Sequence, residues 1–395
     1  MPHLESARGG LCGSVTLAEM TALSIELLSQ TCHTRKAAHF RDSGLNGGTG
    51  RTAIIRRKST LDDVARLARV SPITVSRAIR NPQMVSEELR LRIDRAVRKL
   101  GYVPDVAASR LASARSHAIG VIVPTLYNVI FSEYLQALHE VFLPMGFQIV
   151  VVNSRYSQEE EERAVRTLLG QRVEAMIIVG VNHTETTRQM LVRSRIPVIE
   201  TFQIAEDPIG INIGLDQVRA GHDATRALLK AGFRRVGFIF GIRDERAAER
   251  HTGYEHAMAD AGQTTAGLVK FLTQPSSVAL GARIMGQFAD GPFPEAVFCI
   301  DDNLALGAMQ ECRRFGLRIP DDIAILGFHD LEFAAFASPS LSSIATHRYE
   351  TGKLAAEQTL RLLNGTSVKE RKVMNLGYKL VSRQSTPVIS LDASG

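Results

Sequence analysis

The stretch TLDDVARLARVSPITVSRAIR, residues 60–80, predicts two short helices separated by a tight turn. Thr60 and Asp63 have the spacing of a capping box, in which each side chain bonds the backbone N–H of the other residue. Ser71 is a good N-cap, and Pro72 suits the first helical position because an N–H there would have no partner. The apolar residues of the first helix fall on one stripe: Leu61, Val64, Ala65 and Ala68.

The residues that follow predict a third helix packed against the first two. Asn81-Pro82 ends the second helix, because the residue before a proline disfavours the helical conformation. Ser86 starts the third helix and Gly101 ends it, with one inward stripe between them: Leu89, Ile93, Ala96, Val97 and Leu100. Three short helices in this order predict a DNA-binding helix-turn-helix, although similar helix pairs also occur in proteins that bind no nucleic acid.

The positive charge of the chain is concentrated around these helices. The 395 residues carry 47 Lys+Arg and 41 Asp+Glu, a net charge of +6. Residues 51–115 hold fifteen basic and six acidic side chains, a net charge of +9, whereas residues 1–50 are neutral and residues 116–395 carry a net charge of −3. One strongly basic segment indicates binding to a polyanion, with a solvated basic helix surface as the alternative.

From His117 onward, short apolar runs alternate with amphipathic stretches such as residues 159–169 and 217–231. Buried strands with helices between them predict parallel sheets covered on both faces. The expected strands are residues 119–123, 148–152, 175–179, 197–201, 236–240, 296–300 and 323–326. Such a long segment exceeds one small sheet, so we expect two α/β lobes with a ligand between them.

Several function classes lack their motifs. The chain has no nucleophile elbow, HExxH, phosphate loop or dinucleotide fingerprint after a strand, and its eleven histidines lack metal-ligand spacing. Four cysteines without metal or redox spacing favour reduced thiols in the cytoplasm, and no apolar run approaches the roughly 20 residues that span a bilayer. We therefore expect no enzyme, cofactor, metal or membrane partner. A solute receptor could share the two-lobed fold, but the basic helices and the missing secretion signal argue against it.

Motifs along the chain resemble the lactose-repressor (LacI) family of bacterial transcriptional regulators. They match in order and spacing over nearly the whole chain after residue 58: residues 60–65, 70–71, 74–77, 85–86, 101–104, 111–112, 119–121, 253–254, 301–307, 316–323 and 327–328. The resemblance implies a helix-turn-helix at residues 59–102, a hinge helix and linker at 103–115 and a two-lobed domain at 116–395. Residues 1–55 are expected to be a disordered, dispensable extension or the result of a misplaced translation start.

The resemblance implies that a homodimer reads a palindromic operator in double-stranded DNA. The residues implied for DNA binding are Thr60, Ser71, Pro72, Ile73, Thr74, Ser76, Arg77 and Leu111. Pro72, Ile73 and Arg77 occupy the positions that choose bases, and Arg77 can donate two bonds to guanine. The hydroxyl groups fit phosphates, with helix capping as the alternative for Ser71 and Thr74. Leu111 would enter the minor groove from the hinge helix, with core packing as the alternative.

The body after residue 116 resembles the type I periplasmic-binding-protein fold, a two-lobed clamp around a small ligand. The implied effector-binding residues are Pro124, Asn128, Phe131, Arg250, Asp301, Asp302 and His329. Arg250 would grip hydroxyls or ligand charge, and Asp302 is the better hydroxyl acceptor of the acidic pair. The alternative for that pair is capping of the helix that follows, and for Phe131 it is plain core packing.

His329 stands where many sugar-binding relatives carry Asp. A histidine removes a negative charge and supplies a donor that can become cationic, so Arg250 and His329 could share a carboxylate. Residues 244–246, 253–255, 298–299, 311–312 and 327–329 resemble the gluconate-operon repressor branch. We expect gluconate or a similar sugar acid to release a cytoplasmic homodimer from its operator, with a neutral sugar or a nucleobase as the alternative effector. A dimer is preferred because no leucine-zipper-like tail is evident.

Overall fold

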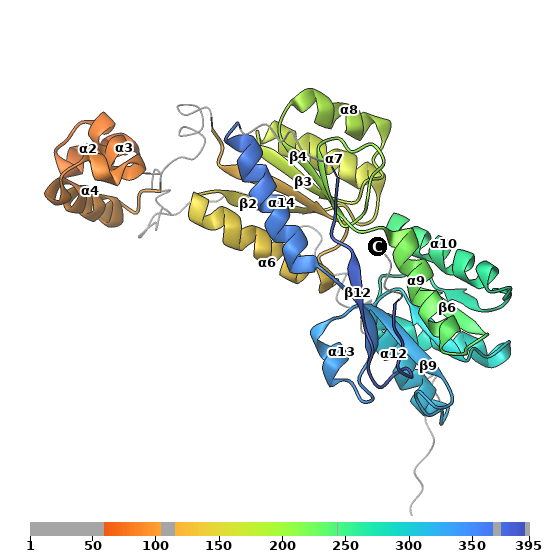
Figure 1. Cartoon of the computed structure of the whole chain (residues 1–395). Coiled ribbons are helices and arrows are strands. Elements are labelled where there is room, and N and C mark those ends of the chain that lie inside the picture. Colours follow the sequence, from red (N-terminus) through yellow and green to blue (C-terminus); the bar gives the residue numbers. More distant parts are fainter. Residues whose placement is uncertain (1–58, 104–114, 243, 366–372, 392–395) are drawn as a thin grey trace, which may run out of the picture. The chain divides into compact units, whose positions relative to one another are not determined.

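The computed structural model describes residues 59–103, 115–242, 244–365 and 373–391. The chain divides into two compact units, Met1–Pro104 and Asp105–Gly395, which are described separately (Figure 1). The expected extension at residues 1–55, the hinge helix and Leu111 lie outside the described residues. No helix in the described ranges is long and apolar enough to cross a lipid bilayer.

The first unit contains the three helices that the capping signals predicted. They are α2 (Leu61–Ala68), α3 (Pro72–Arg80) and α4 (Glu87–Leu100), with a 3₁₀ turn η1 (Pro82–Met84) after α3. The capping box is confirmed, since Thr60 Oγ1 accepts from the Asp63 N–H at 3.3 Å and Asp63 Oδ2 accepts from the Thr60 N–H at 2.9 Å. The inward stripes meet in one small core: Val64, Ala65, Ala68, Val75, Ala78, Ile93 and Ala96. Ser86 occupies the N-cap position of α4 without a side-chain capping bond.

The second unit consists of two α/β lobes with the same strand order. The sheet of the first lobe has the order β11-β5-β4-β3-β1-β2. Its strands are β1 (Ala118–Val123), β2 (Gln148–Asn153), β3 (Ala175–Val179), β4 (Val198–Thr201), β5 (Ile211–Gly214) and β11 (Val373–Asn375). The sheet of the second lobe has the order β12-β10-β9-β8-β6-β7. Its strands are β6 (Val236–Phe240), β7 (Val269–Phe271), β8 (Ala296–Cys299), β9 (Ala324–His329), β10 (Ser342–Thr346) and β12 (Tyr378–Val381).

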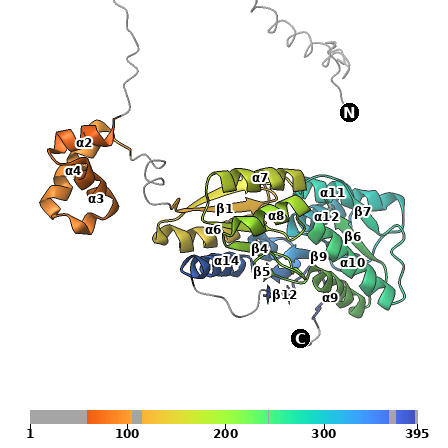
Figure 2. The ribbon, with the colours of Figure 1, turned by 90° about the horizontal axis from the view of Figure 1, so that it is seen from above.

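All strand pairs are parallel except β10 with β12, as near-continuous apolar strands predict. In the first lobe, α6 (Ile130–Phe142) and α14 (Arg348–Leu363) cover one sheet face, and α7 (Gln158–Gly170) and α8 (Glu185–Ser194) cover the other (Figure 2). The helices of the second lobe are α9 (Gln217–Lys230), α10 (Glu245–Asp260), α11 (Val278–Gly286), α12 (Asp302–Arg314) and α13 (Glu332–Phe336). Short 3₁₀ turns η2 (Leu143–Met145) and η3 (Gln287–Asp290) follow α6 and α11.

The chain passes between the lobes three times. It leaves the first lobe between β5 and α9, returns between β10 and α14, and leaves again between β11 and β12. The division of residues between the lobes is therefore interleaved, so that α14 packs against α6 of the first lobe although it follows β10 of the second. These crossings bring residues from both lobes to one cleft.

The sequence indicated the seven strands β1, β2, β3, β4, β6, β8 and β9 to within three residues at each end. It did not indicate β5, β7, β10, β11 or β12. Three of these, β7, β11 and β12, are sheet edges of three or four residues with half-exposed side chains, so they carry no continuous apolar run. Both lobes have the same strand order, but no internal repeat is visible in the sequence.

Candidate functional site

The second helix of the first unit presents the side chains expected to meet DNA. Val75 is fully buried in the small core and Ile79 packs against it, so this face anchors α3. Ile73 is 71% exposed, and Pro72 and Arg77 are also exposed, whereas Ser76 is half-buried. An exposed apolar residue beside an exposed arginine is a surface that can contact base edges in a major groove.

The hydroxyl groups expected at phosphates also perform local capping. Ser71 Oγ accepts from the Thr74 N–H at 3.2 Å, and the two hydroxyl oxygens lie 2.8 Å apart. Thr60 is the N-cap of α2. The capping role offered as the alternative for Ser71 and Thr74 is thus present in the structure, and the exposed Ser71 hydroxyl retains access to solvent.

A cavity lies between the two lobes of the second unit. Fifteen residues line it: Asn128, Ile130, Tyr156, Phe202, Leu215, Gln217, Ile242, Asp244, Arg246, Arg250, Ser276, Ile300, Asp301, His329 and Thr346. Many of these residues lie at or just beyond the carboxyl ends of strands, which is where open parallel sheets place their ligands. The mixture of apolar walls with a few polar groups is typical of a small-molecule site.

Three lining residues have a left-handed backbone although none is glycine. They are Tyr156 (φ 58°) after β2, Phe202 (φ 75°) after β4 and His329 (φ 98°) at the end of β9. A β-carbon disfavours this conformation, so the surrounding structure must hold it. Its occurrence at three separate strand ends on one cavity is typical of a binding site.

Arg250 is positioned by the close crossing of α9 and α10. A β-carbon on Gly253 would clash with the carbonyl oxygen of Val218 on α9, so only glycine permits this approach. Arg250 is 4% exposed, donates from Nη1 to Gln217 Oε1, and places its guanidinium carbon 4.5 Å from the ring centre of Phe328. Burial lowers the pKa of Arg250 to about 10, so it is cationic at neutral pH. Its Nε–H is buried without a partner among the described residues.

Arg246 lies one helical turn before Arg250 and forms an ion pair with Asp244, the N-cap of α10. Burial opposes charge at both groups, but their mutual attraction outweighs it, lowering the pKa of Asp244 and raising that of Arg246. Arg246 Nη1 is also buried without a partner in the described part of the chain. Two buried guanidinium groups with unused N–H donors therefore line the same cavity.

The two acidic residues after β8 have different environments. Asp301 lines the cavity and caps α12, accepting from the Leu304 N–H at 3.0 Å, and burial raises its pKa. Asp302 is fully buried away from the cavity lining, where it accepts from Ser343 Oγ and from the Leu331 N–H at 2.6 Å each. The structure thus gives the cavity position to Asp301, the residue that the sequence ranked second, and a bonding role in the interior to Asp302.

The buried position of Asp302 explains the glycine in the motif Gly327-Phe328-His329. A β-carbon on Gly327 would clash with Asp302 Oδ1, so glycine makes room for the buried carboxyl group. Burial raises the pKa of Asp302 to about 7. The two residues are 25 positions apart in the sequence, and only the sheet brings them together.

His329 lines the cavity as a neutral side chain. Burial lowers its pKa well below the usual value, and Arg250, Arg348 and Arg246 lower it further. Its Nδ1 lies 3.1 Å from Thr346 Oγ1. The expectation that His329 becomes cationic therefore has to be corrected for this structure, because three arginines already surround the ring.

The remaining expected residues lie on the first-lobe side. Asn128 lines the cavity, and its Oδ1 accepts from the Ile130 N–H at 3.2 Å. Phe131 is buried behind the wall against Phe202, with ring centres 5.4 Å apart, which is the core packing offered as its alternative. Pro124 lines the adjoining part of the cleft, where Asn182 donates to Glu245 across the lobes at 2.9 Å.

Several lining residues were missed, among them Tyr156, Gln217, Ser276 and Thr346. Each lies at or near the end of a helix or strand, so its place in the cavity depends on the lobe crossings and, for Tyr156, on a positive φ that no local pattern encodes. Asp244 and Arg246 lie within a motif that resembles the gluconate branch, and the charge of Arg246 one helical turn before Arg250 was an available signal.

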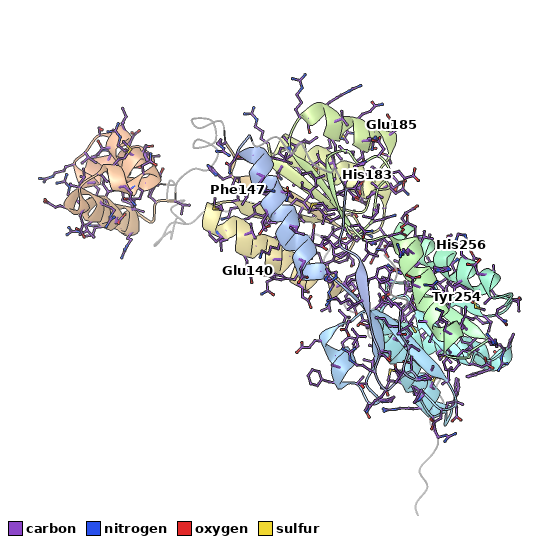
Figure 3. The ribbon with its side chains drawn as sticks, viewed as in Figure 1. Glu140, Phe147, His183, Glu185, Tyr254 and His256 are labelled. Atoms are coloured by element: carbon purple, nitrogen blue, oxygen red, sulfur yellow. The ribbon has the colours of Figure 1, made fainter. Side chains whose placement is uncertain are left out.

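A second buried charge cluster lies in the first lobe around His183 (Figure 3). Its Nδ1 lies 2.6 Å from Glu161 Oε1 on α7, and its Nε2 lies 3.5 Å from Glu200 Oε1 on β4. Burial alone would lower the pKa of His183, but the bonds to the two carboxylates outweigh it and raise the pKa to about 9. The histidine is therefore protonated at neutral pH.

This cluster predicts a pH-dependent stability. A raised pKa stabilises the fold fully below about pH 6.5, where the unfolded histidine is also protonated, and this contribution disappears as the pH rises through about 9. The wild type should lose up to about 3 kcal/mol of unfolding free energy over that window. The variant His183→Gln should lack this component in thermal melts between pH 6 and 9.5. His256→Gln, at an exposed position on α10, is the control variant. Identical pH profiles of stability for His183→Gln and the wild type would refute the expectation.

Comparisons with known proteins give consistent findings for both units. Residues 60–105 match the family described as bacterial regulatory proteins, lacI family, and residues 225–386 match a periplasmic binding protein-like domain. The chain is 40% identical over 331 residues to the HTH-type transcriptional regulator GntR of Pseudomonas aeruginosa, covering 83% of this chain and 96% of the relative. It is 35% identical over 326 residues to GntR of Escherichia coli K12, covering 82% and 98%.

Solved structures show the same architecture. A GntR transcription regulator from Chromobacterium violaceum is 34% identical with a TM-score of 0.65, covering 68% of this chain and 99% of that chain. A lac repressor dimer bound to operator and the anti-inducer ONPF is 25% identical with a TM-score of 0.72, covering 84% and 100%.

Proposed function

Because the chain belongs to the LacI family of DNA-binding transcriptional regulators, which are not enzymes, we propose that it represses genes for the use of gluconate or a related sugar acid. It binds operator DNA through α3 and is released when the effector enters the cleft between the lobes. The similarity to regulators named GntR and the branch motifs at residues 244–246 and 327–329 support this effector class.

One observation carries the effector chemistry. Arg246 Nη1 and Arg250 Nε are buried, unpartnered and part of one cavity. A buried guanidinium N–H without an acceptor is costly, and a carboxylate is the acceptor that matches it best. Asp301, Ser276 and Tyr156 line the same space and provide partners for hydroxyl groups.

The mechanism follows from where the lobes meet. Gln203 of the first lobe donates to Glu249 of the second at 2.6 Å, beside the bond between Asn182 and Glu245. An effector that contacts both lobes favours one relative angle of the lobes, and we propose that this angle disfavours the pairing of hinge helices that the family resemblance implies at residues 103–115. Since coupling is reciprocal, operator binding must weaken effector binding by the same factor.

We propose that the protein acts as a homodimer, and that one apolar patch contributes to the interface. Leu126, Tyr127 and Val129 lie together in the turn between β1 and α6, and Tyr127 is 75% exposed. Exposed tyrosines in apolar patches are frequent anchors of protein interfaces. The similarity to a lac repressor dimer supports a second copy as the occupant.

The variant Tyr127→Glu should therefore weaken dimerisation. Placing a charge in a desolvated interface should raise the dimer dissociation constant by at least about tenfold. Sedimentation equilibrium measures this constant directly. Val192→Glu on α8 is the control, because Val192 is also exposed and apolar but lies on another helix. Equal effects of the two substitutions on the dimer dissociation constant would refute the proposal that this patch contributes to the interface.

Calorimetry tests the proposed effector class. Titration of the full chain with D-gluconate should give saturable binding, whereas glucose, galactose, adenosine and hypoxanthine should give none at the same concentrations. Binding of a neutral sugar or a nucleobase with gluconate inert would overturn the proposal and favour the alternative effector.

A further inference from the structure

Arg246 differs from Arg250 in what it faces. It lies in the first turn of α10, is 9% exposed, and lines both the cavity and the adjoining part of the cleft. Its Nη2 pairs with Asp244, and its Nη1 has no partner. Asp244 therefore holds the guanidinium in place from one side and leaves a donor on the other.

Arg246 and Arg250 act on the cavity as a pair. They are four residues apart on one helix, which places both side chains on the same face. Their charges repel, as the lowering of the pKa of Arg250 by Arg246 indicates. Each also leaves one buried N–H unused, so the two guanidinium groups together offer two donors, the number that the two oxygens of one carboxylate can accept.

His329 does not supply the second contact to an anion. Its ring is neutral, and Arg250, Arg348 and Arg246 oppose its protonation. Arg348 donates to Glu133 and to the carbonyl oxygen of His329, and its Nε–H has no partner among the described residues, but Arg348 does not line the cavity. His329 is thus suited to a hydroxyl group, and the unused guanidinium N–H donors within the cavity lining belong to Arg246 and Arg250.

The charges of the cavity limit how many negative charges a ligand can bring. Arg246 and Arg250 are balanced by Asp244 and Asp301, all four within the lining. One carboxylate satisfies the two unused N–H groups. A phosphate ester brings a charge of about −1.5 to −2 and three oxygens, which would face Asp244 and Asp301 without further unused guanidinium donors in the lining.

Resting on the proposed function, we infer that Arg246 is the residue that selects for a ligand carboxylate, and that this site prefers monoanionic polyhydroxy acids to their neutral and phosphorylated counterparts. Arg250 grips any ligand, and Arg246 distinguishes the acid from the alcohol. The Asp244 carboxylate is the positioning group that holds Arg246 toward the ligand.

The test compares three ligands with matched carbon chains on the full protein: D-gluconate, D-glucitol and 6-phosphogluconate. The wild type should bind gluconate about 10- to 100-fold more tightly than glucitol, the range expected for one charge-assisted contact. 6-phosphogluconate should bind more weakly than gluconate. In Arg246→Gln the preference for gluconate over glucitol should fall to about threefold or less, because the affinity for gluconate should fall much more than the affinity for glucitol.

Arg155→Gln is the matched control, because it removes the same charge from an exposed side chain next to Tyr156 that lines neither part of the cleft. Operator binding reports folding of every variant, and Arg246→Lys should retain an intermediate preference if Arg246→Gln folds poorly. Equal losses for gluconate and glucitol, or an unchanged preference, would overturn the inference while the proposed effector stands. A wild type that binds glucitol but not gluconate would instead overturn the proposed function.

Discussion

The variant Arg250→Met is expected to bind its operator normally but to lose its response to effector. The guanidinium of Arg250 joins Gln217 at the start of α9 to the ring of Phe328 on β9, and it leaves an unused N–H in the cavity. Methionine keeps the apolar stem and removes the charge. Loss of charge-assisted bonds in a buried site should cost about 3 kcal/mol of effector binding, a factor of about 100.

Two measurements on one sample decide this expectation. Calorimetry with D-gluconate gives the loss of affinity, and anisotropy of a labelled operator shows that DNA binding survives. Arg193→Met is the control, since Arg193 is an exposed residue on α8 of the first lobe. An effector affinity within threefold of the wild type would show that Arg250 does not contact the ligand.

The variant Arg77→Ala should lose sequence discrimination. Arg77 is exposed on α3, whose opposite face is fixed by the buried Val75. A bidentate contact to guanine contributes about 1–3 kcal/mol of discrimination, so specific binding should weaken by about 10- to 100-fold. Binding to scrambled DNA should weaken far less, because that binding depends on phosphate contacts.

Competition between the operator and scrambled DNA at fixed salt measures the ratio. Arg92→Ala on α4 removes the same charge from another exposed position of the first unit. It should lower both affinities by a similar factor and leave their ratio intact. If Arg77→Ala behaves in the same way as Arg92→Ala, Arg77 does not read bases.

The helix-turn-helix could be predicted from sequence because its signals are local. Thr60 with Asp63 and Ser71 with Pro72 set two helix starts within a few residues of each boundary, and the structure confirms both. Central strands such as β3 and β6 are buried on both faces, so their apolar runs are visible. Edge strands such as β7 are held by pairing with a neighbour rather than by their own composition.

The cavity could be predicted only in part. Asn128, Arg250, Asp301 and His329 reach it, as the family resemblance implied. Asp302 lies beside Asp301 in the sequence but is hydrogen-bonded to Ser343 and Leu331 in the interior. Its position next to Asp301 therefore did not show whether its side chain reaches the cavity.

Other features of the cavity depend on contacts distant in the sequence. The neutral state of His329 depends on Arg348, which follows the second crossing between the lobes. The approach of Tyr156 and Phe202 depends on left-handed backbone conformations that their residue types disfavour. These features arise from the assembled fold and not from any local pattern.

The central claim is that occupation of the cleft controls operator binding, and one linked titration tests it. The operator is a palindromic fragment that the full protein selects from random DNA. Its affinity is measured with and without saturating D-gluconate, and the affinity for gluconate is measured with and without saturating operator. We predict that gluconate weakens operator binding and that operator weakens gluconate binding by the same factor. An operator affinity unchanged by bound gluconate would contradict the account.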